Sequence, residues 1–300
     1  MAIGQPSQAV KVRQQAEQLA AVLPPLLVEA ERIASTVAQG VHGRRRVGTG
    51  DAFWQYRRYQ PGDAASQIDW RQSAKRQRYY VRQNEWELAE SIWLWRDGSP
   101  SMAWHSDWSA TDKSDRATLL LLALASLLVR GGERVALLGE GRLPSTGRVT
   151  LDRLAQTLLL PRGNPLLNQS LPSRVPLPRD AQVVLIGDFL SPLGELESSI
   201  RSFAGDGVRG HLLQIMDPAE EDLPYQGRTR FQGMEGERTL LISRVETLRD
   251  AWKNRLAERD AALRDLARRT GWSFARHRTD RPPQTALLAL YAALSGGLSS

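Results

Sequence analysis

The spacing of hydrophobic positions divides the chain into a helical start, a short-period middle and a long remainder. Residues 8–40 carry apolar side chains at helical spacing, and Pro24-Pro25 predicts a break into two helices. The following stretch is rich in aromatic residues and contains Pro61-Gly62-Asp63, which is a turn signal typical of a small β-rich module. The predicted domains are therefore a helical segment at 1–43, a basic, aromatic β-rich module at 44–90 and a larger domain at 91–300.

From residue 91 onward, short apolar runs alternate with longer amphipathic segments. The runs predict strands at 91–96, 134–138, 182–186, 210–216 and 272–276. The segments between and after them predict helices at 115–130, 151–160, 194–204, Val245–Leu266 and 283–294, with hairpins near 142–150 and within 217–243. Apolar strands that alternate with helices indicate an α/β fold, a doubly wound and mostly parallel sheet flanked by helices. Such sheets bind ligands outside the carboxyl ends of their strands.

The clearest chemical signal follows the first of these strands. There Asp97, Ser99 and Ser101 place one carboxylate and two hydroxyls on a single short loop. Hard oxygen donors of this kind suit Mg²⁺ or Mn²⁺ better than zinc. Asp188 follows the third predicted strand in the same way. If the two strands are neighbours, both carboxylates meet in one crevice.

Composition narrows the class of protein. The chain has no cysteine, which excludes disulfides, thiolate catalysis and cysteine-based zinc sites. The amino terminus lacks the basic and apolar pattern of a signal peptide. The longest apolar stretch, Ala117–Val129, is too short to span a bilayer. These features predict a cytoplasmic protein.

The positive charge is concentrated in one segment. The net charge is +7, and between Arg44 and Arg82 ten Lys and Arg face three Asp, which already gives +7. Such a segment is typical of a nucleic-acid footprint or of a docking face for an acidic protein. Tryptophan and arginine are favoured at contact surfaces. The candidate partner-binding residues are Arg57, Arg58 and Arg71 in this segment, and Trp104 and Trp108 after the Asp97 loop.

Taken in order, these motifs resemble the von Willebrand factor A-like proteins, and specifically the bacterial domain-of-unknown-function family 58. The likeness runs from about residue 30 to the carboxyl terminus. Two departures stand out: Arg96 precedes the loop where the family usually has an apolar residue, and the membrane helices of many members are missing here. The matching stretches are Gly48–Phe53, Arg57–Asp63, Ile68–Ala74 and Asp97–Met102.

The resemblance implies a metal-ion-dependent adhesion site for Mg²⁺ or Mn²⁺, with one coordination position open to a partner's carboxylate. In this family the two serines bind the metal directly, and the first aspartate binds directly or through water. The family is associated with MoxR-type AAA+ ATPases in protein assembly or maturation, so the implied partner is such an ATPase or its client. The implied ligands are Asp97, Ser99, Ser101, Asp188 and either Thr146 or Thr150.

Three functions follow from these observations. The first is a non-enzymatic interaction protein that captures a partner carboxylate through the metal. The second is a nucleic-acid-binding protein that uses residues 44–82, and the third is a metal-dependent hydrolase. The sequence has no phosphate-binding G-x-x-x-x-G-K-[ST] loop, and Gly205–Gly210 matches G-x-G-x-x-G in the wrong order of helix and strand. No catalytic residue is therefore assigned.

Overall fold

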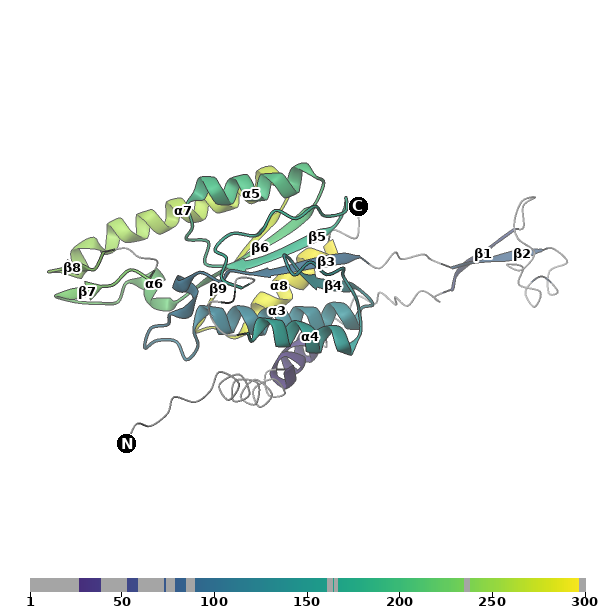
Figure 1. Ribbon diagram of the computed structural model, residues 1–300, viewed down its shortest axis with the longest axis horizontal. Helices are drawn as coiled ribbons and strands as arrows, with labels where there is room; N and C mark the ends of the chain where they lie inside the picture. The colour runs from purple at the N-terminus through teal and green to yellow at the C-terminus, as the bar shows by residue number, and fades with distance from the viewer. Residues whose placement is uncertain are drawn as a thin grey trace, which may run out of the picture. The chain divides into compact units, whose positions relative to one another are not determined.

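The chain divides into two compact units, one of Met1–Val41 with Glu90–Ser300 and one of His42–Ala89 (Figure 1). The computed structural model describes residues 27–38, 53–58, 73, 79–84, 90–160, 164, 167–234 and 238–296.

The smaller unit contains two antiparallel strands, β1 (Phe53–Arg58) and β2 (Tyr80–Asn84), whose register is irregular near Phe53. Two of the candidate partner-binding residues, Arg57 and Arg58, lie on β1, and Arg71 lies outside the described residues. Because this unit's basic side chains are not among those described, nucleic-acid binding through residues 44–82 stays a prediction.

The larger unit is built on a five-stranded sheet in which every neighbouring pair is parallel. The strand order is β4-β3-β5-β6-β9. This arrangement confirms the predicted α/β architecture with a parallel sheet flanked by helices. The strands are β3 (Ser91–Arg96), β4 (Arg134–Leu137), β5 (Gln182–Gly187), β6 (Arg209–Met216) and β9 (Ser273–Arg278).

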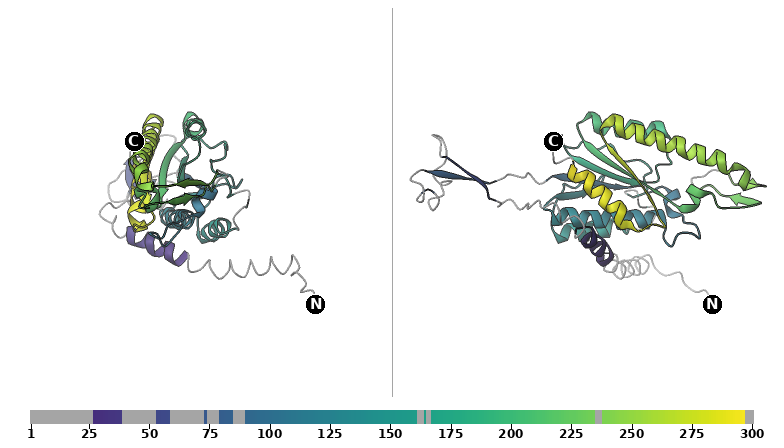
Figure 2. Two further views of the ribbon diagram at one scale, coloured as in Figure 1. Left: turned by 90° about the vertical axis from the view of Figure 1, so that its left-hand side faces the viewer. Right: turned by 180° about the vertical axis from the view of Figure 1, so that it is seen from behind.

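Helices cover both faces of this sheet (Figures 1 and 2). One face carries α3 (Lys113–Arg130), α4 (Arg148–Leu158) and α8 (Pro283–Gly296), and the helical residues 27–38 pack into the same apolar cluster. The other face carries α5 (Leu193–Gly205) and α7 (Arg249–Thr270).

The alternation of side chains along β3 explains why both layers form. Ile92 and Leu94 belong to the apolar cluster between the sheet and α3, whereas Trp93 and Trp95 belong to the cluster between the sheet and helices α5 and α7. Successive side chains of a strand point to opposite faces, so a strand that is covered on both sides is apolar throughout. Each such side chain contributes about 1.5–3 kcal/mol when it is fully buried.

The most deeply buried helix is α3, which lies directly beneath the sheet. Its side chains from Ala117 to Leu128 are buried without a gap. It begins at Lys113, because the carboxylate of Asp112 accepts a hydrogen bond from the Asp115 N–H at 2.7 Å. Among the described residues, no helix is long and apolar enough to cross a membrane.

Of the two predicted hairpins, the structure confirms the one within 217–243 and not the one near 142–150. The one near 142–150 reduces to a single antiparallel bridge between Val135 and Ser145. The segment 217–243 does hold a hairpin, but a short helix, α6 (Pro218–Asp222), precedes it. A capping box starts α6. The Asp217 carboxylate accepts a hydrogen bond from the backbone N–H of Glu220, and the Glu220 carboxylate accepts one from the backbone N–H of Asp217. The hairpin strands are β7 (Thr229–Phe231) and β8 (Leu240–Ile242).

A buried histidine joins three neighbouring strands. Nε2 of His211 on β6 lies 3.1 Å from Oε1 of Gln182, and its Nδ1 lies 2.8 Å from Oγ of Ser273. Because an amide oxygen only accepts, Nε2 carries the ring proton and Nδ1 accepts from the Ser273 hydroxyl. The neutral ring therefore satisfies both partners. Burial, with a smaller contribution from Arg209, lowers the pKa of His211 to about 4.

We expect the free energy of unfolding to decrease as the pH falls from about 6.5 toward 4. The unfolded chain takes up a proton on His211 near pH 6.5, whereas the folded chain keeps the ring neutral until about pH 4. His211 contributes roughly 3 kcal/mol to this loss. Urea unfolding at several pH values measures it, and His211→Gln should flatten the curve. Burial, and to a smaller extent Arg116, also lowers the pKa of His277 to about 4. The pH dependence of a His277→Gln variant is therefore the matched comparison. An unchanged slope in His211→Gln contradicts the assignment.

Candidate functional site

Two aspartates meet at the carboxyl edge of the sheet. Asp97 follows β3 and Asp188 follows β5, and these strands are direct neighbours. The ladder continues one step beyond β3, because the Asp97 N–H donates to the carbonyl of Ile186 at 2.8 Å. Both carboxylates are buried. The structure therefore brings together the two acidic residues that the sequence places after separate strands.

The loop after β3 is held in a fixed shape. Oδ1 of Asp97 accepts a hydrogen bond from the Ser99 N–H at 2.8 Å, and a short 3₁₀ helix, η2 (Pro100–Ala103), follows. Gly98 donates to the carbonyl of Gln169 at 2.9 Å. A Cβ at Gly98 would lie only 1.4 Å from the carbonyl oxygen of Leu167, so a side chain does not fit there.

The two serines connect this loop to the second aspartate. Oγ of Ser99 lies 3.0 Å from Oγ of Ser101, which donates to Oδ2 of Asp188 at 2.7 Å. Oδ1 of Asp188 accepts from the Leu190 N–H at 3.1 Å. The predicted residues Asp97, Ser99, Ser101 and Asp188 thus form one cluster of oxygen atoms, here called the oxygen cluster.

A lysine that the sequence analysis did not single out is part of this cluster. Nζ of Lys113 lies 2.9 Å from Oδ2 of Asp188 and 2.5 Å from Oε1 of Glu220 on α6. The lysine side chain is fully buried. Burial acts to lower the pKa of Lys113, but the attraction of Asp188 and Glu220 outweighs it and leaves this pKa raised. The ammonium is therefore charged.

Backbone contacts fix the segments around the oxygen cluster. Asp217 accepts hydrogen bonds from the N–H groups of Ser106 at 2.9 Å and of Ala219 at 2.8 Å. Arg259 of α7 donates from Nε to the carbonyl of Phe189 at 2.9 Å and also binds the carbonyl of Ser191. These contacts tie the loops after β5 and β6 to the helices beside them.

The two candidate threonines lie elsewhere. Oγ1 of Thr150 donates to the carbonyl of Thr146 at 3.0 Å and lies 2.9 Å from Oγ of Ser145. Ser145 bridges to Val135, which pairs with the second residue of β3. That register is about 17 Å along the strand from Asp97. The segment folds back over the amino end of β4, so the structure brings neither threonine to the oxygen cluster and places Lys113 and Glu220 beside it instead.

The oxygen atoms of the cluster lie at hydrogen-bond distances from one another, and neighbouring ligands of a small divalent cation have similar separations. Mg²⁺ prefers octahedral oxygen ligands at about 2.0–2.1 Å, and adjacent ligands are then about 2.9 Å apart. The separations from Ser99 Oγ to Ser101 Oγ and from Ser101 Oγ to Asp188 Oδ2 are 3.0 and 2.7 Å. Across the part of the chain that the structure describes, no group of three or more His, Asp or Glu is placed to hold a metal. A cation held at this cluster would need the serine hydroxyls among its ligands.

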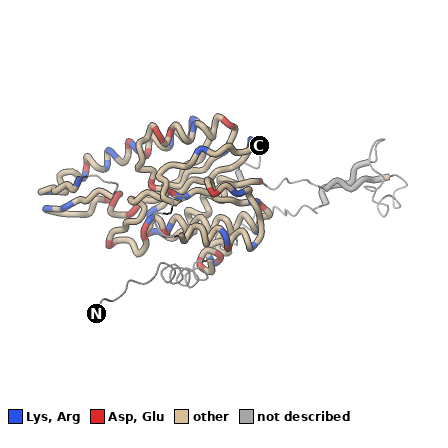
Figure 3. The backbone as a smooth tube through the Cα atoms, in the orientation of Figure 1, with Lys and Arg blue, Asp and Glu red and all other residues tan. Residues whose placement is uncertain are grey.

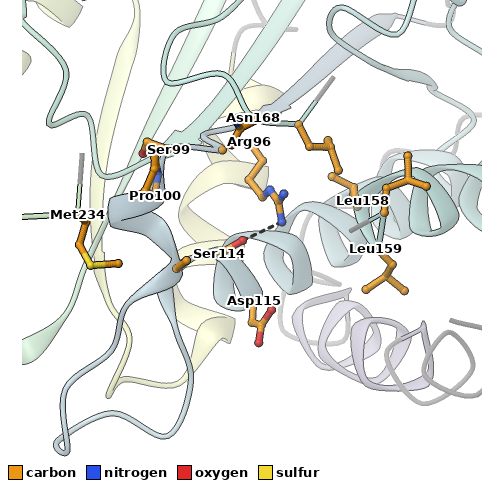
Figure 4. A pocket seen from close by; sticks show the side chains of 13 residues that line it. Arg96, Ser99, Pro100, Ser114, Asp115, Leu158, Leu159, Asn168 and Met234 are labelled. Carbon is orange, nitrogen blue, oxygen red and sulfur yellow. Dashed lines mark hydrogen bonds between the residues drawn. The ribbon is translucent and has the colours of Figure 1, made fainter. Parts of the chain in front are cut away.

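A cavity of about 440 Å³ adjoins the loop on the side of α3 (Figure 4). Arg96 and Ser99 are among its lining residues, with a wall of leucines. Nη1 of Arg96 donates to Oγ of Ser114 at 2.9 Å and to Oγ1 of Thr118 at 2.7 Å. The guanidinium of Arg96 is thus directed to α3, although this residue directly precedes Asp97.

Exposed aromatic and aliphatic side chains lie near the segment that connects α6 to the β7–β8 hairpin and on the hairpin itself. Trp108 is 50% exposed, and its ring packs edge to face against Tyr225 at 5.6 Å, which packs in turn against Phe231 at 5.9 Å. Trp104 is half-buried. Leu240 on β8 is 59% exposed. Large exposed apolar patches mark interaction sites more often than isolated apolar residues do.

Some of the missed residues carry a signal in the sequence. Lys113 shares a helix face with Ala117, Leu120 and Leu124, which are all buried. It is therefore a charged residue on a buried face of α3. Glu220 is the fourth residue of the Asp217-x-x-Glu capping pattern. A charge on an otherwise apolar helix face predicts a buried ion pair, but it does not identify the partner.

The fold and the oxygen cluster define an α/β protein with a polar site at the carboxyl edge of a parallel sheet. The model of the family described as "Protein of unknown function DUF58" matches residues 55–262, which is more than half of the chain. The chain therefore belongs to the DUF58 family.

Two similar relatives carry the name of uncharacterized proteins. The chain is 28% identical over 277 residues to "Uncharacterized protein Mb1516" of Mycobacterium bovis and, equally, to "Uncharacterized protein Rv1480" of Mycobacterium tuberculosis. Each alignment covers 88% of this chain and 86% of the relative.

Solved structures show weaker likenesses. The conserved hypothetical protein BatB from Bacteroides thetaiotaomicron is 13% identical, with a TM-score of 0.42, over 71% of this chain and all of that one. An aerotolerance-related membrane protein from Bacteroides fragilis is 15% identical, with a TM-score of 0.41, over 69% of this chain and all of that one.

We expect Gly187→Ala to destabilise the fold and displace the Asp97 carboxylate. A Cβ at Gly187 would lie 2.6 Å from Cβ and 2.9 Å from Oδ2 of Asp97, and both groups are buried. Overpacking of this kind costs about 1–3 kcal/mol. Urea unfolding measures the loss. Gly194→Ala in α5 is the control, because nothing lies within 4 Å of its added Cβ. Equal stability of the two variants contradicts the expectation.

Proposed function

We propose that this protein is a non-enzymatic interaction module of the von Willebrand factor A type. It holds Mg²⁺ or Mn²⁺ at the oxygen cluster and binds a carboxylate of a protein partner at the open position of the ion. Ser99 and Ser101 are the proposed direct ligands, with Asp97 and Asp188 as the acidic groups. The observation that supports this most is the convergence of two serine hydroxyls and two buried aspartates from separate loops.

The donor set favours binding over catalysis. Two of the proposed ligands are neutral hydroxyls, which leave a bound cation more attractive to an incoming carboxylate. A hydrolase also needs a general base within hydrogen-bond reach of the attacking water. Lys113 is protonated, and Asp188 already accepts hydrogen bonds at both of its oxygens. These contacts hold both side chains within the oxygen cluster.

The surface beyond α6 supports an acidic protein as the partner. The hairpin of β7 and β8, with the exposed Leu240, and its flanks carry the exposed arginines 228, 230 and 238 (Figure 3). Acidic residues, among them Asp107, lie instead near Tyr225, the ring partner of Trp108. Apolar anchors with basic neighbours complement a partner segment that is both acidic and apolar. The partner class proposed from the family resemblance is a MoxR-type AAA+ ATPase or a client of it.

We expect Asp97→Ala to abolish cation-dependent binding and to leave far-UV circular dichroism unchanged. The test uses labelled peptides that contain Asp or Glu, each matched with its Asn or Gln counterpart, in Mg²⁺ and in EDTA. The wild-type protein should bind an acidic peptide at least about tenfold more tightly in Mg²⁺ than in EDTA. Asp206→Ala is the control, since this exposed residue follows α5 at the opposite edge of the sheet. Equal wild-type binding in Mg²⁺ and in EDTA rules the proposal out.

A further inference from the structure

A positive charge is already built into the oxygen cluster. The ammonium of Lys113 bonds to the same Asp188 oxygen, Oδ2, that accepts the Ser101 hydroxyl. A carboxylate oxygen has two lone pairs, so both acceptor positions of this oxygen are filled. The side chains of Lys113 and Asp188 are 0% and 1% exposed, so water does not screen their attraction.

Acidic side chains outnumber this ammonium around the oxygen cluster. The one ammonium of Lys113 serves both Asp188 and Glu220, and burial raises the pKa of the Glu220 carboxyl although the attraction of Lys113 opposes this. Asp217 is buried close by and is stabilised by two backbone N–H groups. Arg259 binds backbone carbonyls rather than these carboxylates.

We infer that Lys113 is a resident cation that competes with the divalent ion for Asp188 and thereby lowers the affinity of the oxygen cluster for Mg²⁺. This inference rests on the proposed function, because it concerns the same cation. To use Oδ2 of Asp188 as a ligand, a divalent ion would have to replace the ammonium or approach it within a few ångströms. Like charges at that distance repel strongly in a buried site.

Competition for Asp188 would also change the contacts that hold α6, because Lys113 joins Asp188 to this helix. The Lys113 ammonium joins α3, the loop after β5 and α6, since its two partners are Asp188 and Glu220. If a divalent ion takes Asp188, only the contact from Lys113 to Glu220 remains. Cation binding would then alter how α6 is held, and α6 leads into the β7–β8 hairpin.

The experiment is a calorimetric titration of Mg²⁺, repeated with Mn²⁺, into three proteins. The wild type should bind weakly, and Lys113→Met should bind about tenfold or more tightly, because it frees Asp188 and restores the full negative charge. Lys113→Arg keeps the charge and should behave like the wild type. A parallel thermal melt should show a larger rise in Tm with Mg²⁺ for Lys113→Met than for the wild type.

If Lys113→Met does not fold without metal, Lys113→Met with Glu220→Gln replaces it, because that pair removes one carboxylate together with the ammonium. Equal affinities of wild type and variant overturn this inference and leave the proposed cation site standing. Binding by the variant alone supports the inference and overturns the proposed function of the wild type. Binding by neither protein overturns both.

Discussion

The parallel pairing of β3 with β5 is the constraint on which the site depends. It places the ends of two strands side by side, and the bond from the Asp97 N–H to the Ile186 carbonyl extends the pairing into the loop. Gly187 leaves room for the Asp97 side chain against the end of β5. Asp188 follows directly, so its carboxylate and the Ser101 hydroxyl are within hydrogen-bond distance. A different strand order would separate Asp188 from the loop that carries Asp97 and Ser101.

Burial makes this site sensitive to charge. Bringing carboxylates out of water is costly, and an ion pair offsets the cost only when its geometry and remaining hydrogen bonds are good. Asp188 meets that condition with the Lys113 ammonium, the Ser101 hydroxyl and the Leu190 N–H. Removing one member of such a pair typically costs 3–5 kcal/mol. The ammonium therefore stabilises the fold, whatever else binds at the edge of the sheet.

The sequence predicts the fold well because local patterns and tertiary packing agree. The apolar run from Ile92 to Trp95 is a strand covered on both faces, and the alternation of such runs with helices leaves few topologies other than a parallel sheet. The first part of the oxygen cluster is also predictable, since Asp97 and the two serines lie within five residues of one another. The choice between Thr146 and Thr150 depended on the path of a loop, which spacing does not encode. Lys113 and Glu220 come together across 107 residues, and only the folded chain shows that contact.

The neighbouring residues Arg96 and Asp97 point in different directions at this edge, because successive side chains of a strand alternate. The guanidinium of Arg96 extends to the hydroxyls of Ser114 and Thr118 on α3 and lines a cavity, whereas Asp97 points to the end of β5. The arginine therefore does not occupy the oxygen cluster, and its charge is spread over two hydroxyl partners. Lys113 contacts Asp188 of the cluster directly. Because α3 carries Lys113 at its start and Ser114 beside it, this one helix end positions both cations, and the electrostatics of the edge depend on where α3 begins.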